Sequence, residues 1–155
     1  MQRRLFVAAG AFVALRPAYA HHGWSGFDTT KPLWLEGRAL RVAWRNPHAE
    51  FELQPAGDLR VPEDLARRRL PAQTSAVDGP GLLAEARVPE RRAAMWRVEL
   101  APLSRLQAWQ VEEIKPGDSV AVLGYTTSTP RDEPVLRAEY LFVGDKVYGL
   151  RSSPA

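Results

Sequence analysis

Several segments of the chain alternate between hydrophobic and polar residues, which is the pattern of strands with one buried face. The alternation is cleanest over residues 49–54, where Phe51 and Leu53 are predicted to face inward. Residues 33–44 are predicted to form a longer strand whose inward parity changes near Gly37. A change of parity at a glycine predicts a bulge or a strong bend in that strand.

Further strands are predicted over residues 95–101, 119–127, 135–143 and 146–150. A short amphipathic helix is predicted over residues 104–111, with Ser104 as its N-cap. In the strand 135–143 the predicted inward residues are Leu136, Ala138, Tyr140 and Phe142, with Arg137 and Glu139 on the opposite face. By the same parity argument Trp44, Trp96 and Trp109 are predicted to belong to the core.

Residues 55–94 differ in character, because they are rich in Pro, Gly, Arg and Ala and lack strand alternation. Two short helices are predicted there, over residues 62–69 and 81–87. A stretch of this length without structure of its own is unusual inside a compact domain. We therefore predict an inserted excursion that packs on the outside of the remaining structure.

The order of the predicted elements indicates the fold class. Two strands, a long excursion, a strand, a short helix and two more strands match the OB-fold, a five-stranded Greek-key barrel. The sequence predicts an all-β, OB-like barrel forming a single domain over residues 21–155, with the excursion at 55–94. A generic β-sandwich is the alternative.

Residues 1–20 have the layout of a secretory signal peptide. Arg3 and Arg4 precede an apolar stretch over residues 5–15, and residues 18–20 offer the small residues that a signal peptidase needs. The apolar stretch is shorter than the roughly 20 residues that span a bilayer. We expect cleavage after Ala20, export by the general secretory or the twin-arginine route, and a periplasmic or secreted protein without stable membrane insertion.

Cleavage would change the charge balance of the protein. The full chain has 21 basic and 18 acidic residues and a formal net charge of +3. The three arginines within residues 1–20 account for this excess, so the mature chain is formally neutral, which argues against nucleic acid as a partner. The chain has no cysteine, which excludes disulfides and thiolate metal sites. It carries no motif of a hydrolase or a phosphate-binding loop, which favours a protein without catalytic activity.

The histidines of the mature chain are the candidate metal ligands. Cleavage after Ala20 would give His21 a free α-amine, and an N-terminal histidine can chelate a metal through that amine and its own ring. His48, which follows Asn46 and Pro47, is the natural third donor of such a histidine brace for Cu(II). His22 offers a second mode, in which its ring chelates together with the amine and the first peptide nitrogen.

Other residues near the mature N-terminus are candidates for a ligand site. Trp24 could stack on a small ligand, and Phe27, Asp28 or Glu50 could supply a further group beside a metal. The plainer interpretation makes the N-terminus a solvated end, His48 a turn residue and Trp24 a cover for the core. Glu50 and Glu52 share an outward face with Arg97 and Glu99 as potential cross-strand partners, for which surface pairing is the ordinary explanation.

Four segments of the chain resemble one family of proteins. They are the mature start HHGWS (residues 21–25), the segment from Leu35-Glu36-Gly37 to Trp44-Arg45-Asn46-Pro47-His48, the run ELAPLSR (99–105) and the ending YGLRSSPA (148–155). The chain resembles a family of small exported bacterial proteins of unknown function. The resemblance implies export and a single β-rich domain, and it brings no activity, substrate or catalytic residue.

Two functions follow as hypotheses. The first is an exported small-ligand or metal-binding domain that holds Cu(II) through an N-terminal histidine brace. The alternative is a periplasmic protein-interaction module without metal or catalytic activity, with residues 55–94 as its contact surface.

Overall fold

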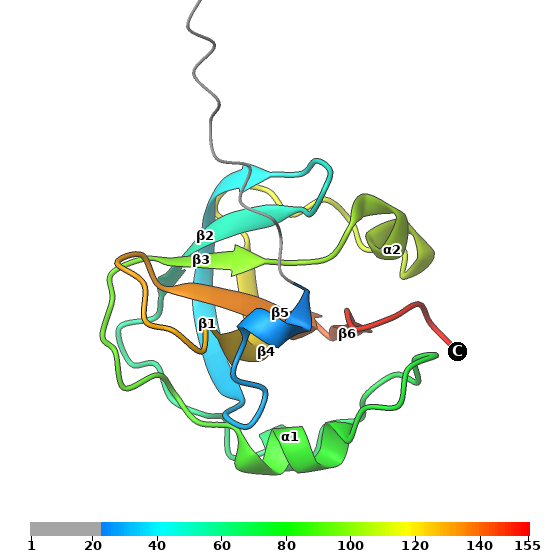
Figure 1. Cartoon of the computed structure of the whole chain (residues 1–155), viewed down its shortest axis with the longest axis horizontal. Helices are drawn as coiled ribbons and strands as arrows, with labels where there is room; N and C mark the ends of the chain where they lie inside the picture. Colours follow the sequence, from blue (N-terminus) through cyan, green and yellow to red (C-terminus); the bar gives the residue numbers. More distant parts are fainter. Residues whose placement is uncertain (1–22) are drawn as a thin grey trace, which may run out of the picture.

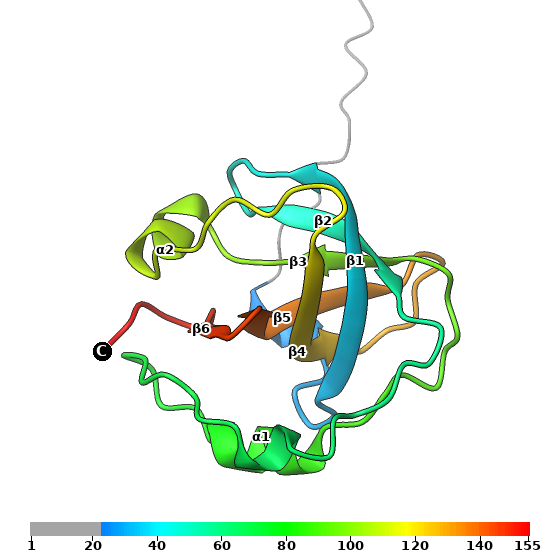
Figure 2. The same cartoon turned by 180° about the vertical axis from the view of Figure 1, so that it is seen from behind.

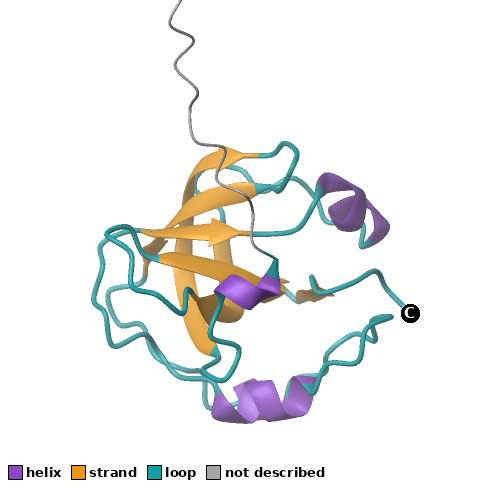
Figure 3. Cartoon of the chain, viewed as in Figure 1, coloured by secondary structure: helices purple, strands orange, loops and turns teal. Residues whose placement is uncertain are grey.

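The computed structural model describes residues 23–155, and its elements are shown in Figures 1 and 3. Its strands are β1 (Leu33–Ala43), β2 (Glu50–Pro55), β3 (Trp96–Glu99), β4 (Ser119–Thr126), β5 (Val135–Val143) and β6 (Lys146–Gly149). Two short α-helices, α1 (Gly79–Glu85) and α2 (Leu103–Ala108), and two 3-10 turns, η1 (Trp24–Gly26) and η2 (Leu65–Arg67), complete the elements.

The strands close into a barrel, and the predicted OB-like fold is confirmed. The sheet has the order β3-β2-β1-β4-β5-β6, and β3 also pairs with β5, so that β1 to β5 form a closed ring. The β3–β5 pairing is parallel, while the other pairings are antiparallel. Helix α2 lies between β3 and β4 in the chain, as in an OB-fold, and β6 extends the sheet beyond β5. Figure 2 shows β1 and β4 side by side from behind.

Strand β1 contains the predicted irregularity, at a different residue. Leu35 and Ala39 face the barrel core, and Val42 packs against the same core after a register shift between Leu40 and Ala43. Arg41 within this step has a φ of 40°, and a local left-handed residue is typical of a bulge. Gly37 has another role, because a Cβ there would lie 1.9 Å from the carbonyl oxygen of Gln54 on β2.

In strand β5 the predicted inward face is correct up to Ala138 and wrong after it. Leu136 and Ala138 belong to the barrel core, as expected, whereas Tyr140 and Phe142 lie in a second cluster outside the barrel. The reason is a bulge at Glu139, because Tyr140 pairs with Leu123 while Ala138 pairs with the next residue of β4. The extra residue moves every later side chain to the opposite face.

Two hydrophobic cores result from this arrangement. The barrel core includes Trp96, and Trp44 and Trp109 pack against it while staying partly exposed. The second core lies between the outside of the barrel and the excursion of residues 55–94, and it contains Trp34, Leu65, Leu83, Ala121, Leu123, Tyr140 and Phe142. The excursion is therefore a covering layer, and α1 lies below the barrel in Figure 1.

The predicted helices are shorter or shifted. Residues 62–69 form only η2, because Leu65 is buried in the second core and the chain becomes extended at Arg68. Helix α1 begins two residues early, because the Asp78 carboxylate accepts a hydrogen bond from the Gly81 N–H at 3.0 Å as its N-cap. Helix α2 starts at Leu103 after Pro102, so Ser104 is not its N-cap. No helix within residues 23–155 is long and apolar enough to span a membrane.

Candidate functional site

A row of polar side chains crosses four strands on the outside of the barrel. Glu50 on β2 pairs with Glu99 on β3, Glu99 pairs with Arg137 on β5, and Arg137 pairs with Tyr125 on β4. An Nη1 to Oε2 distance of 3.7 Å joins Arg137 to Glu99, whose side chain is 14% exposed. The row therefore places the like charges of Glu50 and Glu99 on neighbouring strands and the opposite charge of Arg137 beside Glu99, at a partly covered surface.

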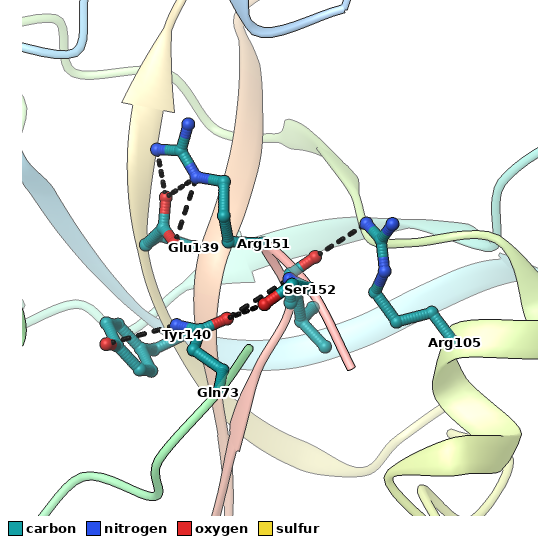
Figure 4. Close-up of polar contacts among 7 residues, drawn as sticks. Gln73, Arg105, Glu139, Tyr140, Arg151 and Ser152 are labelled. Carbon is teal, nitrogen blue, oxygen red and sulfur yellow. Dashed lines mark hydrogen bonds and ion pairs between the residues drawn. The ribbon is translucent and has the colours of Figure 1, made fainter. Parts of the chain in front are cut away.

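A buried ion pair adjoins this row. Glu139 is fully buried, and its carboxylate accepts a hydrogen bond of 2.9 Å from Nε of Arg151, with Nη2 of the same arginine as a second donor. Figure 4 shows the two side chains facing each other. Burial raises the pKa of Glu139, and the hydrogen bond and charge of Arg151 act in the opposite direction.

The polar network continues into the C-terminal segment. Gln73 of the excursion donates to the Tyr140 hydroxyl at 3.3 Å and accepts from the Ser152 N–H at 3.1 Å. Arg105 of α2 donates to the carbonyl oxygen of Leu150 at 3.1 Å. These contacts, drawn in Figure 4, hold the ending of the chain between the excursion and α2. The segment that carries Arg151 is thereby fixed in position.

Trp24 covers Arg137 of the cross-strand row and Arg151 of the buried ion pair, and we call these residues and their neighbours the cluster. Its ring centroid lies 3.7 Å from Cζ of Arg151 and 4.9 Å from Cζ of Arg137, and it contacts Tyr125 edge-on with ring centroids 6.1 Å apart. Phe27 adds a second ring 5.9 Å from Arg137. In Figure 1 the blue turn η1 lies in front of β5. Cation–π contacts thus attach the start of the described chain to the barrel.

The turn η1 is also tied to the end of β4. The Asp28 N–H donates to the carbonyl oxygen of Thr126 at 3.0 Å, and the Ser128 N–H donates to that of Gly26 at 3.1 Å. Asp28 forms an ion pair with Lys31 at 3.1 Å. Hydrogen bonds from Thr30, with the Lys31 side chain, lower the pKa of Asp28. Asp28 is therefore engaged locally.

Arg137 is a buried cation with few partners. Its side chain is 7% exposed, and its Nε has no hydrogen-bond acceptor among the described residues. The contact with Glu99 at 3.7 Å is an ion pair that is too long for a hydrogen bond. Burial lowers the pKa of Arg137, and Arg105 and Arg151 act in the same direction while Glu99 opposes them. The guanidinium is therefore less well satisfied than that of Arg151.

His48 lies on the connection between β1 and β2. Ala49 and Phe51 belong to the barrel core, so alternation along β2 puts Glu50 on the outer face. The His48 ring is partly exposed and its Nδ1 is shielded from solvent. The Ala49 N–H donates to the carbonyl oxygen of Ala101 at 3.1 Å, which ties this connection to the chain beyond β3.

The structure thus brings some of the predicted site residues together. Trp24 and Phe27 both face Arg137, and Glu50 belongs to the same cross-strand row. His21 and His22, like the proposed signal peptide, lie outside the described residues. Within residues 23–155, no group of three or more His, Asp or Glu side chains is arranged to hold a metal ion.

Four members of this cluster were not predicted as site residues. They are Tyr125, Arg137, Glu139 and Arg151. Arg137 and Glu139 stood out in the sequence only as charges within an otherwise apolar strand. That pattern, two opposite charges in a strand with hydrophobic residues on both sides, is the one signal that could have indicated them. Arg151 comes near them only through the fold of the C-terminal segment.

The fold and this cluster define a small OB-like barrel with a polar site on its outer face, covered by its own N-terminal turn. Residues 10–61 match the model of a family of unknown function, DUF6152, which confirms the resemblance inferred from the sequence over this part of the chain. The match includes HHGWS and the segment ending at His48, while the other two segments lie beyond it. Neither a curated protein nor a solved structure matches the chain.

Proposed function

We propose that the mature protein is an exported domain that binds Cu(II) at its N-terminus, through the α-amine and ring of His21 with His48 as a further donor. The proposal includes removal of residues 1–20 and a periplasmic or secreted location. The observation that carries it is the docking of η1, which attaches Trp24 to Arg137 and Arg151. This docking determines the face of the barrel from which the N-terminus starts.

The position of η1 relative to Glu50 bears on this site. After cleavage only His21 and His22 would precede Gly23, and two residues span at most about 7 Å. Arg137, beneath Trp24, is joined to Glu50 through Glu99, and two strand spacings amount to about 10 Å. His48 lies two residues before Glu50, on the connection that precedes β2. The proposal therefore has the N-terminal segment extend along this row toward the connection, with the side chains of His21 and His48 spanning the remaining distance.

The chemistry of the donors favours Cu(II). Amine and imidazole nitrogens bind Cu(II) more tightly than other divalent first-row metals at comparable sites. Glu50, at the start of β2, is the carboxylate that follows His48 most closely in the chain, so we assign it as the group beside the metal. Asp28 is less suited, because it is engaged with Lys31 and Thr30. Metal binding at an amine requires its deprotonation, so the affinity should rise with pH.

The first test compares two forms of the protein. Export from a bacterial host yields the natural N-terminus, which intact mass confirms, and a second form carries one extra residue before His21. Titration with Cu(II) should give one tight equivalent for the natural form and binding at least about 100-fold weaker for the extended form, a difference of about 2.8 kcal/mol. Equal binding by both forms would refute the brace. An intact mass that still includes residues 1–20 would refute the proposal, because His21 would then have no free α-amine.

The second test separates the histidines. His48→Ala should weaken Cu(II) binding and change its visible spectrum, whereas His22→Ala should leave both close to the wild type. The reverse result would assign the metal to an N-terminal chelate with His22. Absence of Cu(II) binding by the natural form would favour the interaction module, with residues 55–94 as its contact surface.

A further inference from the structure

Arg137, beneath Trp24, has a buried hydrogen-bond donor that lacks an acceptor among the described residues. Only 7% of the Arg137 side chain is exposed. Among the described residues, no hydrogen-bond acceptor lies within reach of its Nε. An arginine carries five N–H donors in a planar fork that matches an oxyanion. Leaving such donors buried without a partner costs free energy.

The neighbouring carboxylates do not accept a hydrogen bond from Nε of Arg137. Glu139, two residues along β5, is committed to Arg151 through hydrogen bonds from Nε and Nη2. Glu99 stays 3.7 Å from Nη1 of Arg137. The aromatic rings of Trp24 and Phe27 compensate part of the charge, but they offer no acceptor in the plane of the guanidinium.

Two further arginines lie near Arg137. Arg105 and Arg151 both act on Arg137 as like charges, while Glu99 and Glu139 act as opposite charges. Glu139 is already hydrogen-bonded to Arg151, and Glu99 lies 3.7 Å from Arg137. An anion beside the Arg137 guanidinium would meet an attraction that burial strengthens.

We propose that Arg137 is the floor of a binding site for a small oxyanion, a carboxylate or phosphate group, with Trp24 and Phe27 as its roof. Trp24 lies in η1, which has no buried residue, and Phe27 follows it; opening the roof breaks the hydrogen bonds from the Asp28 N–H to Thr126 and from the Ser128 N–H to Gly26. The oxyanion accepts hydrogen bonds from the Arg137 fork, and the rings of Trp24 and Phe27 close over its carrier. None of its residues is a proposed metal donor, although both sites depend on the docking of Trp24 onto Arg137, and the test below uses metal-free protein so that the two proposals can fail separately.

The test uses the mature protein, labelled with ¹⁵N and free of metal. The Nε–Hε resonance of Arg137 is followed during separate titrations with sodium phosphate and sodium acetate, at constant ionic strength maintained with sodium chloride. A saturable shift at millimolar concentration is expected, together with a shift of the Trp24 indole resonance. The tighter of the two anions identifies the chemistry of the carrier. The exposed Arg38, which donates to the carbonyl oxygen of Gly117, should show no saturable shift.

Glu99→Gln provides the sharpest variant. Removing a carboxylate that competes for Arg137 should tighten oxyanion binding by about tenfold, whereas a merely structural role for Glu99 would not improve binding. Arg137→Lys should abolish the saturable shift of Trp24. If that variant does not fold, the Glu99→Gln titration decides. Shifts that chloride alone reproduces, or unchanged affinity in Glu99→Gln, would overturn the proposal.

Discussion

The carboxylate of Glu139 is fully buried and is held by the guanidinium of Arg151, 12 residues later in the chain. This contact joins the bulge of β5 to the C-terminal segment. Arg151 in turn carries the ring of Trp24. One ion pair therefore links the barrel, the end of the chain and the N-terminal turn that covers the candidate site.

Loss of this ion pair should destabilise the protein. Glu139→Ala leaves Arg151 without its partner, at a cost of about 3 kcal/mol, the lower end for breaking a buried pair, because Arg151 is 25% exposed. Urea unfolding of the mature protein measures the change. Glu112→Ala is the matched control, because it removes an exposed ion pair with Lys146 and should change stability by less than about 1 kcal/mol. Equal effects of the two variants would contradict the role of Glu139.

Tyr125 should resist ionisation. Burial, followed by the charge of Glu139, raises its pKa to about 12. Because the folded state holds this proton more tightly, its contribution to stability is complete below about pH 10 and is lost as the pH rises through about 12. Unfolding free energies measured from about pH 9 to about pH 12 should fall more steeply for the wild type than for Tyr125→Phe. Parallel slopes would show that Tyr125 is not buried.

Gly124 should be required for the bulge at Glu139. A Cβ at Gly124 would lie 2.1 Å from the carbonyl oxygen of Arg137, and backbone cannot yield as a flexible side chain can. Gly124→Ala should cost about 3 kcal/mol or more and should disturb the Arg137 resonances. Gly57→Ala is the control, because nothing lies within 4 Å of the added Cβ, and it should change stability by about 0.5 kcal/mol at most. A stable Gly124→Ala variant would argue against the bulge.

Much of the barrel could be predicted from the sequence, because hydrophobic alternation records which face of a strand is buried. Phe51 and Leu53 face the core as predicted, and the predicted partners of Glu50 and Glu52 are the observed ones, Glu99 and Arg97. Alternation fails where the register shifts. The bulge at Glu139 depends on a close approach between β4 and β5, which the residues of β5 alone do not reveal.

The second core explains the other failures. Trp34 is fully buried outside the barrel, beneath the excursion, so its strand is apolar on both faces and shows no alternation there. The candidate site is non-local for a similar reason. Trp24, Arg137 and Arg151 meet only after both ends of the chain have folded onto β5, and no spacing in the sequence reports such a contact.

Electron paramagnetic resonance of the Cu(II)-loaded mature protein tests the proposed function most directly. With one equivalent of Cu(II), the wild type should show a single species whose hyperfine pattern contains nitrogen couplings from His21 and His48. His48→Ala should lose one imidazole coupling and keep the chelate of His21. An identical spectrum for wild type and His48→Ala would contradict the proposed site.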